Sequence, residues 1–441
     1  MPSATQSAPA IAHCPHCAAE VPVDADRCSS CGRLVRERSA RITLAITLLL
    51  IFAAIALTQS FVNLHRQTEM GLARRWFARG EQAMQAHLYK FASDAYRTAL
   101  NYDRENEQYR LRLAQALMGE GSRAAVAEAR AHLLSLWEEE PANGEVNLTL
   151  ARLEAQRQHS SDAIRYYNDA INGVWQDDPR KHRTEARFEL AHYLMQQHNP
   201  ARAQAELLAL LADAPSDPAD QLLLGQMLLR VNDSQHALQA YSALLASHPD
   251  NAQAWLGAGQ AYLALGNYAE AEHASARAVE HDSQLEAARS QLDLARELLR
   301  IDPAQRGLPL AERADRTASN FEAAFKRLNE CAIEQKVNLA VPGAAAPSSS
   351  GNATTAGTSP TTAATTNSTA APGPLQLLYT SGSQKQADAT AKALRKNPDG
   401  IEPMMQYVFE VEQATAPLCP NMSLTDRALL TLAQHESESP K

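Results

Sequence analysis

The sequence predicts a mainly α-helical chain: an α-solenoid of about six helical hairpins, preceded by a small four-cysteine unit and one membrane-spanning helix, and followed by a small helical module. Three observations carry this prediction. Small and apolar residues recur every 34 residues, an apolar run is free of charge, and four cysteines form two C-x2-C pairs. Because 441 residues are enough for about three domains, a single compact core is not expected.

The overall charge identifies no partner. The formal net charge is -9, the isoelectric point is about 5.9, and no block of basic residues offsets this balance. Residues 1–41 hold five arginines against four acidic residues, a net of +1 before any thiolate is counted. There is no strong case for nucleic acid as a partner, because such a weak charge gives little attraction to phosphates.

The four-cysteine unit, residues 12–33, predicts a structural Zn²⁺ site. Cys14, Cys17, Cys28 and Cys31 read C-x2-C-x10-C-x2-C. Each pair can turn two thiolates toward one ion, and four thiolates leave no open coordination position for water. The ion is therefore expected to stabilise the fold. A pair of redox C-x-x-C sites is the alternative, but the surrounding sequence lacks the alternating strands and helices of thioredoxin-like proteins.

In this pattern of cysteines the unit resembles the small zinc ribbons at the front of many bacterial membrane proteins. The resemblance covers only residues 12–33 and implies that the four cysteines are the zinc ligands. His13 and His16 are then expected beside the site or facing solvent. Catalytic zinc is not expected, since a closed site serves folding.

The apolar run from Ile42 to Val62 predicts one transmembrane helix. Its 21 residues include no charge. At about 1.5 Å per residue, such a helix matches the roughly 30 Å hydrocarbon core of a bilayer. A buried core helix is the soluble alternative, but nothing beside the run makes it amphipathic. A cleaved signal peptide is not expected, because a long cysteine-bearing segment precedes the run.

Two observations predict a cytoplasmic N-terminus, with residues 63–441 periplasmic or otherwise extracytoplasmic. Five arginines precede the run and four follow it, a slight positive-inside bias. Four reduced thiolates also suit the cytosol better than an oxidising compartment. The expected location is the bacterial inner membrane, crossed once.

The 34-residue period predicts helical hairpins over residues 73–285. Blocks start at residues 184, 218 and 252, and the fixed 34-residue spacing places small residues at block positions 8 and 20 and proline or serine at position 32. These residues are Ala191, Gly225, Gly259; Ala203, Ala237, Ala271; and Pro215, Pro249, Ser283. The pattern closely resembles the tetratricopeptide repeat. In that family the small residues let the two helices of a hairpin approach, and the proline ends the second helix.

Upstream blocks follow the same pattern with more drift, which brings the expected total to six repeats. The second and third blocks need about three extra residues each, in a connection or a lengthened second helix. Residues 286–301 are then predicted to be a helix that caps the last repeat, because solenoids need a polar outer face at each end.

The tetratricopeptide resemblance implies a groove, lined by the first helix of each repeat, that binds partner proteins or peptides. Position 5 is always apolar: Phe77, Leu111, Leu148, Phe188, Leu222, Leu256. Position 9 is always polar: Glu81, Gln115, Arg152, His192, Gln226, Gln260. Apolar anchors beside hydrogen-bonding groups suit an extended peptide or a helix. Packing between repeats is the alternative for position 5, and the sequence leaves both interpretations open.

The C-terminal third predicts a helical module divided by a linker. Residues 343–373 contain only Gly, Ala, Pro, Ser, Thr and Asn, a composition that favours disorder. Helical patterns fill residues 315–336 and 375–437, the latter with expected helices near 384–395, 402–413 and 425–434. Ser423 and Asp426 have the spacing of a capping box. Cys331 and Cys419 form a disulfide across the linker or remain two buried thiols.

The predicted function is a membrane-anchored scaffold rather than an enzyme. The sequence has no H-E-x-x-H, phosphate loop, G-x-S-x-G or dinucleotide motif. Two alternatives remain: the ribbon is the functional cytosolic end, binding protein or nucleic acid while the repeats sense something outside, or the C-terminal module holds a catalytic site.

Overall fold

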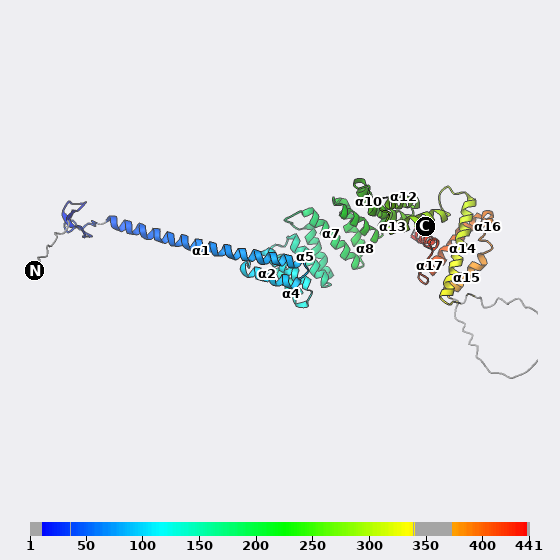
Figure 1. Ribbon diagram of the computed structural model, residues 1–441, viewed down its shortest axis with the longest axis horizontal. Coiled ribbons are helices and arrows are strands. Elements are labelled where there is room, and N and C mark those ends of the chain that lie inside the picture. Colours follow the sequence, from blue (N-terminus) through cyan, green and yellow to red (C-terminus); the bar gives the residue numbers. More distant parts are fainter. Residues whose placement is uncertain (1–10, 36, 338, 340–372, 439–441) are drawn as a thin grey trace, which may run out of the picture. The chain divides into compact units, whose positions relative to one another are not determined.

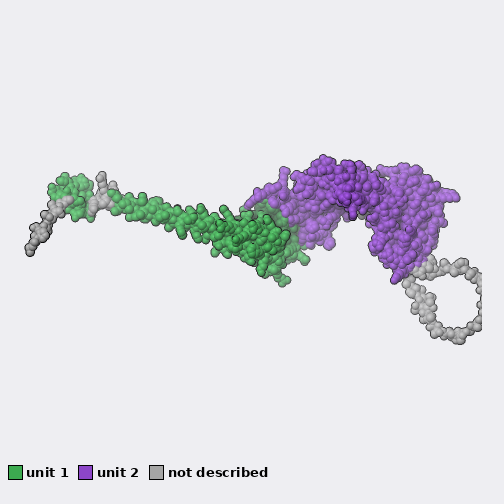
Figure 2. Space-filling model, viewed as in Figure 1, with its two compact units in different colours: residues 1–175 green, residues 176–441 purple. Residues whose placement is uncertain are grey.

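The structure is a computed structural model, which describes residues 11–35, 37–337, 339 and 373–438. The predicted linker at 343–373 lies outside the described residues, apart from Gly373. The chain divides into two compact units, residues 1–175 and 176–441 (Figure 2). Helices dominate both units, which confirms the predicted fold class (Figure 1).

The four-cysteine unit contains the one sheet of the described residues, an antiparallel pair. β1 (Ile11–His13) pairs with β2 (Glu20–Pro22), with His13 opposite Glu20. Strands this short do not form a stable hairpin in water by themselves. Only Val21, Cys14 and Cys28 are buried in this unit, so the cysteines make up most of its small core.

Helix α1 (Glu37–Gln85) contains the predicted membrane span and the first repeat helix in one uninterrupted element of 49 residues. Residues 42–68 are all exposed, and Phe52 is 72% exposed. From Ala73 onward α1 packs against α2 (Tyr89–Tyr102), and Ala73 is fully buried. Within the described part of the chain, α1 is the one helix that is long and apolar enough to cross a membrane, judged by length and composition.

Six helical hairpins follow the predicted period. The first joins the end of α1 to α2, and the other five pair consecutive helices: α3 (Glu107–Glu120) with α4 (Arg123–Glu139), α5 (Gly144–Gln156) with α6 (Ser160–Asn172), α7 (Pro179–Gln196) with α8 (Pro200–Asp213), α9 (Pro218–Arg230) with α10 (Ser234–Ser247), and α11 (Ala252–Ala264) with α12 (Tyr268–His281).

Local chemistry explains where these helices begin and why they pack closely. Seven of them start at an Asn or Asp whose side-chain oxygen accepts a backbone N–H of the first turn: Asn106, Asn143, Asp178, Asn199, Asp217, Asp233, Asn251. The small residue at block position 8 leaves room for an aromatic ring. A Cβ on Gly225 would lie 2.5 Å from Cε1 of Tyr241, so only glycine fits this contact.

The extra residues of the second and third repeats occupy two different places. Helix α4 has 17 residues where α2 has 14, so the second repeat lengthens its second helix. The third repeat instead has a longer connection after α6. There Val174 bridges Asn143, and the Trp175 indole packs on Gly144 while donating a hydrogen bond to the carbonyl of Ala170 at 3.0 Å.

The C-terminal module contains α14 (Leu310–Glu334), α15 (Pro374–Lys385), α16 (Ala391–Lys396), the 3₁₀ turn η1 (Pro398–Gly400), α17 (Ile401–Thr415) and α18 (Leu424–Glu438). The expected single helix at 384–395 is wrong. Pro374 starts α15 ten residues earlier, and Thr390 caps a separate α16 by accepting the N–H of Ala393. The expected capping box is confirmed, because Ser423 and Asp426 bond each other's backbone N–H at 2.9 and 3.1 Å.

Helix α13 (Glu286–Ile301) lies between the last hairpin and the C-terminal module. One apolar core joins Tyr268 of α12 to α13 and to the helices of the module, and Leu298 of α13 is fully buried in it. Helix α18 packs on α13, where the Thr425 hydroxyl donates to Glu297 at 2.5 Å. A terminal capping helix, as predicted for residues 286–301, would expose a polar outer face to solvent. In the structure α18 covers α13 instead.

Candidate functional sites

The four predicted zinc ligands converge in the structure. Their Sγ atoms all lie within 4.8 Å of one another, with Cys14 and Cys31 3.6 Å apart and Cys17 and Cys28 3.5 Å apart. A tetrahedral Zn²⁺ with Zn–S bonds of about 2.3 Å places its sulfur ligands about 3.8 Å apart. The sulfur positions therefore fit one closed four-thiolate site.

Both C-x2-C pairs form the same type of knuckle. The N–H of His16 points at Sγ of Cys14 over 3.5 Å, and the N–H of Ser30 points at Sγ of Cys28 over 3.4 Å. The backbone N–H groups of Cys31 and Ser30 lower the pKa of the Cys28 thiol to about 6, which favours its thiolate. Against the lowering effect of the Ala19 backbone, the neighbouring Cys28 and Cys31 thiols raise the pKa of Cys17 to about 12. His13 and His16 are exposed, as expected for residues outside the ligand set.

The two knuckles close with a positive φ after the second cysteine. Gly32 has φ 74° and its N–H bonds the carbonyl of Cys28, while Ala18 has φ 56° and bonds the carbonyl of Cys14. Glycine adopts this conformation freely, whereas alanine is strained in it. Ala18 is thus a positioning residue of the site that cysteine spacing alone could not identify.

A second group of possible metal ligands, Glu154, His159 and Asp162, is already neutralised by cations. Glu154 is fully buried and pairs with Arg130 and Arg157, both at 2.7 Å. Burial tends to raise the pKa of Glu154, but hydrogen bonds from Arg130 and His159 hold it below its ordinary value. This cluster is an ion-paired part of the core, in which two guanidinium groups would repel a metal cation.

The position-five side chains mostly contribute to packing. Leu111, Leu148, Phe188 and Leu256 are at most 8% exposed, and Leu222 and Phe77 are half-buried. The Phe77 ring stacks on Tyr109 with centroids 4.7 Å apart. Of the two interpretations open from the sequence, packing between helices has the support of the burial.

The position-nine side chains of the first unit form a network with their neighbours. Glu81 accepts a hydrogen bond from the Tyr96 hydroxyl at 2.7 Å and pairs with Arg112 at 3.5 Å. Arg112 also donates to Gln115 at 2.7 Å and pairs with Glu145 at 3.7 Å. Arg152 is half-buried on α5. The polar stripe of this unit is therefore largely satisfied within the chain.

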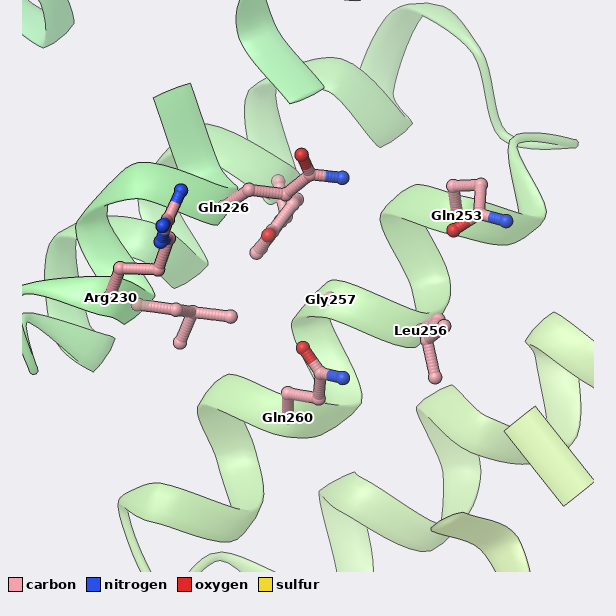
Figure 3. A pocket seen from close by; sticks show the side chains of 8 residues that line it. Gln226, Arg230, Gln253, Leu256, Gly257 and Gln260 are labelled. Carbon is pink, nitrogen blue, oxygen red and sulfur yellow. The ribbon is translucent and has the colours of Figure 1, made fainter. Parts of the chain in front are cut away.

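The position-nine side chains of the second unit are more open. His192 bonds only the neighbouring Gln196, at 2.9 Å, while Gln226 and Gln260 are exposed and have no hydrogen-bond partner within the described chain. Both glutamines line a pocket of about 460 Å³ between α9 and α11 (Figure 3). Arg230 and Gln253 also line it, together with Leu229 and Leu256, so the pocket mixes polar and apolar side chains and carries one positive charge.

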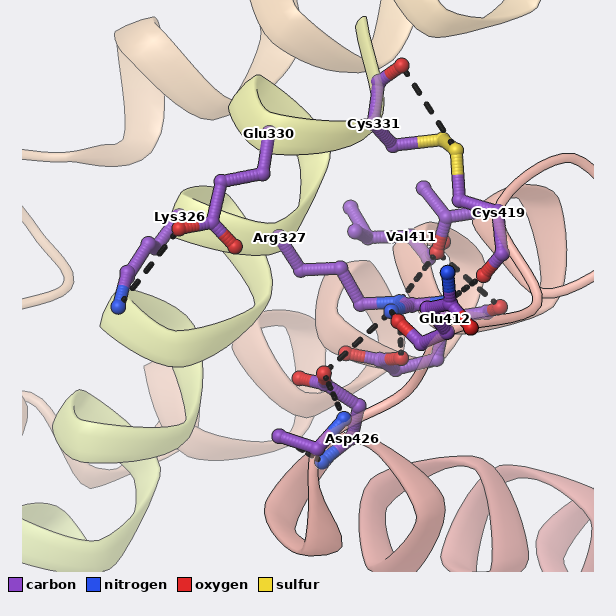
Figure 4. A network of polar contacts seen from close by, with 11 residues as sticks. Lys326, Arg327, Glu330, Cys331, Val411, Glu412, Cys419 and Asp426 are labelled. Atoms are coloured by element: carbon purple, nitrogen blue, oxygen red, sulfur yellow. Dashed lines mark hydrogen bonds and ion pairs between the residues drawn. A yellow bond between two sulfur atoms is a disulfide. The ribbon is translucent and has the colours of Figure 1, made fainter. Parts of the chain in front are cut away.

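The C-terminal module contains a buried charged cluster beside a disulfide (Figure 4). Cys331 and Cys419 are bonded, with Cα atoms 5.8 Å apart. Arg327, one turn before Cys331, donates to the Cys419 carbonyl at 2.9 Å and pairs with Glu412 at 3.1 Å and Asp426 at 3.3 Å. Burial and the nearby Asp426 raise the pKa of Glu412 to about 8, against the lowering effect of Arg327.

Sequence reasoning did not identify this cluster, because its charged residues are distant in the sequence and lie on three helices. A signal was present in α14. Arg327 lies on the same helical face as Phe321, Ala324 and Cys331, which puts a cation on the apolar side of the helix.

Two family models match the solenoid. Residues 63–181 match a cytochrome c-type biogenesis protein H TPR domain, and residues 188–232 and 222–286 match a tetratricopeptide repeat.

Residues 63–286 therefore consist of tetratricopeptide repeats. Solved structures with similar folds include YrrB, described as having an unusual peptide-binding site, at 16% identity over 45% of this chain and 97% of that one, with a TM-score of 0.34. PilF of Pseudomonas aeruginosa is 15% identical over 50% and 97%, with a TM-score of 0.36. The pilus biogenesis factor PilW is 17% identical over 50% and 98%, with a TM-score of 0.37.

These structural similarities are too low to assign a ligand to this chain. No curated protein sequence matches the chain. Tetratricopeptide repeats are typical of scaffolds for protein interaction, and the specificity of this chain has to be argued from its own side chains.

Proposed function

We propose that this tetratricopeptide repeat protein is a single-pass membrane scaffold that binds partner proteins or peptides through its solenoid, with a structural zinc ribbon on the opposite side of the membrane. Helix α1 carries this proposal. It joins 21 exposed, uncharged residues, 42–62, to the first helix of the first repeat. An exposed apolar surface of this size is costly in water and is covered by lipid in a bilayer.

The continuity of α1 also supports a scaffold held close to the membrane. Ten residues, 63–72, separate Val62 from Ala73, the first buried residue of the first hairpin. At about 1.5 Å per residue they form a helical spacer of about 15 Å. A helical spacer restricts the first hairpin far more than a flexible linker would, which suits partners that are themselves at the membrane.

The cysteines support opposite compartments for the two ends. Four thiols placed for Zn²⁺ are compatible with a reducing cytosol, whereas the bonded pair Cys331 and Cys419 is typical of an oxidising compartment. The ribbon would then be cytoplasmic and the repeats periplasmic or otherwise extracytoplasmic. When bound, Zn²⁺ would supply folding energy to the ribbon, and any catalytic chemistry would belong to the partners.

The match of residues 63–181 to a domain named for cytochrome c-type biogenesis supports one class of partner. Biogenesis factors act on other proteins during assembly, so we propose that the partners are proteins being assembled at the membrane. Alkaline phosphatase and green fluorescent protein fusions test the orientation. We expect fluorescence only from the fusion at residue 10 and phosphatase activity only from the fusion at residue 441. The reverse pattern would refute the orientation, and extraction from membranes by carbonate would refute the span.

A second experiment separates the solenoid from the ribbon as the binding end. A photo-crosslinking amino acid at Gln226, in membranes, reports capture by the solenoid, and the same reporter at the exposed Arg202 of α8 serves as control. We expect specific adducts at residue 226 that persist in the Cys14→Ser, Cys28→Ser variant. Loss of all adducts in that variant would assign binding to the ribbon and contradict the scaffold proposal.

A further inference from the structure

The pocket between α9 and α11 has a buried hydrogen-bonding group without a partner. The Tyr241 side chain is 0% exposed, and its hydroxyl has no hydrogen-bond partner within the described chain. Tyr241 nevertheless lines the pocket. A buried hydroxyl left unpaired costs roughly 1–3 kcal/mol, so a ligand atom that accepts its hydrogen bond would gain from its presence.

The backbone on either side is shaped around this ring. A Cβ on Gly225 of α9 would lie 2.5 Å from Tyr241 Cε1, and a Cβ on Gly257 of α11 would lie 2.3 Å from Cζ and 2.6 Å from the hydroxyl oxygen. Both helices can therefore approach Tyr241 only through glycine. Burial raises the pKa of Tyr241, so the hydroxyl stays neutral and able to donate at physiological pH.

The rest of the lining specifies the kind of ligand. Gln226 and Gln260 occupy the same position in consecutive repeats, and each amide can donate and accept, as a peptide backbone requires. Figure 3 shows Gln226 and Arg230 on one helix facing Gln253, Gly257 and Gln260 on the next. Arg230 is exposed and has no ion pair in the described structure, and no acidic residue lines the pocket.

The start of α11 adds to this positive character. Gln253 lies in the first turn of α11, where the partial charge of a helix is positive. The corresponding stripe of the first unit differs, since its Glu81 and Glu145 already neutralise Arg112. An anionic ligand therefore fits the second unit and is disfavoured in the first.

We propose that this pocket binds an acidic peptide segment in extended conformation. A main-chain carbonyl of the peptide accepts the Tyr241 hydroxyl, the amides of Gln226 and Gln260 pair with its backbone, and an Asp, Glu or C-terminal carboxylate pairs with Arg230. The hydroxyl is buried beside Gly257 in the unliganded structure, so it must become accessible on binding. This assignment rests on the proposed protein-binding function and adds the charge and conformation of the ligand.

Random-peptide phage display on the full chain in nanodiscs tests the proposal. We expect selected peptides enriched in Asp and Glu. The variant Arg230→Glu should weaken their binding by at least tenfold and select basic peptides instead, while Arg202→Glu, the same charge change on the exposed face of α8, should leave selection unchanged. Peptides that bind wild type and Arg230→Glu equally would overturn the pocket but leave the scaffold function. No selection above empty nanodiscs would overturn both.

The role of the Tyr241 hydroxyl can be tested separately from that of Arg230. In Tyr241→Phe the ring contacts with Gly225 and Gly257 remain, and an unpaired buried polar atom is removed. We expect an equal or higher melting temperature of the free protein together with about fivefold to tenfold weaker binding of a selected acidic peptide, the worth of one hydrogen bond. Tyr262→Phe on α11 serves as control. Unchanged affinity in Tyr241→Phe, or a loss of stability that accounts for the weaker binding, would overturn the role of the hydroxyl.

Discussion

Removing the Cys331–Cys419 disulfide should lower the stability of the C-terminal module by several kcal/mol. The bond closes a loop with a sequence separation of 88 residues. In the chain-entropy model, a loop of 88 residues corresponds to about 4.6 kcal/mol at 25 °C, within the usual range of about 2–5 kcal/mol for native disulfides. Both sulfurs are buried, so replacing both cysteines by serine also places two hydroxyls in the core. Cys331→Ala, Cys419→Ala is therefore the cleaner variant.

The folded state of this variant retains a second restraint on the same loop. Arg327 donates to the Cys419 carbonyl and to the Thr415 hydroxyl, both at 2.9 Å. We therefore expect a folded module with reduced stability. The assay is denaturant unfolding of the full chain in detergent, with hydrogen exchange read for peptides from residues 286–301 and 401–438. Peptide mapping without reductant measures the bond directly.

The pattern of hydrogen exchange tests whether the disulfide loop stabilises α13 and α18. Helix α18 begins five residues after Cys419 and covers α13, so a destabilised loop should raise exchange in both helices. Peptides from α3 and α5 in the first unit serve as internal controls. Equal stability of wild type with and without reductant would refute a disulfide between these cysteines. A rise confined to residues 416–423 would refute the coupling of the loop to α13.

Three further outcomes are expected. The pKa of Glu412 is raised from 4.5 to about 8 in the folded protein, so wild type should lose stability as pH rises from about 4.5 to 8, by at most about 1.4 kcal/mol per pH unit. In denaturant unfolding, Glu412→Gln should remove this dependence of stability on pH. Glu410→Gln, on the exposed face of α17, should keep it. Gly225→Ala forces a Cβ to 2.5 Å from Tyr241 and should lower the free energy of unfolding by about 1–3 kcal/mol. Gly71→Ala, in open space on α1, should leave stability unchanged or raise it slightly. Equal effects of the two substitutions would contradict the close packing of Gly225 on Tyr241. The full chain should contain one zinc by elemental analysis and lose it in Cys28→Ser, with unchanged helical circular dichroism; a retained metal would contradict the ligand set.

The repeat period predicted most of the helical architecture because it reports which residues share a helical face. Gly225 and Ala237 indicated close helix approach, and Tyr241 does lie against Gly225 in the structure. The same period could not say how deeply a face is buried. Leu256 at position 5 and Gln260 at position 9 are about one turn apart on α11, yet one is buried and the other exposed. That difference depends on the neighbouring helices.

The candidate sites also differ in how far apart their residues lie in the sequence. The zinc ligands are close in sequence, so their spacing alone indicated a common ion. The Arg327 cluster unites side chains 85 to 99 residues apart, on three helices, and no local pattern relates them. The break between α15 and α16 depends on local signals. Pro374 starts one helix and Thr390 caps the next, and these signals outweigh the helical period of residues 384–395.

The position-nine side chains of the two units differ in whether they are already paired within the chain, although both units have the same repeat backbone. Position 9 of the first unit holds Glu81 and Gln115, whose bonds go to Arg112 and its neighbours. A ligand there must break charge-assisted bonds before it makes its own, so the net gain is small. Position 9 of the second unit holds Gln226 and Gln260, which have no hydrogen-bond partner among the described residues. A peptide there exchanges water for protein contacts without breaking an internal pair, and it meets Arg230 unneutralised. Selectivity for an acidic segment then follows from the side chains that each unit leaves unpaired, since both units share the same repeat backbone.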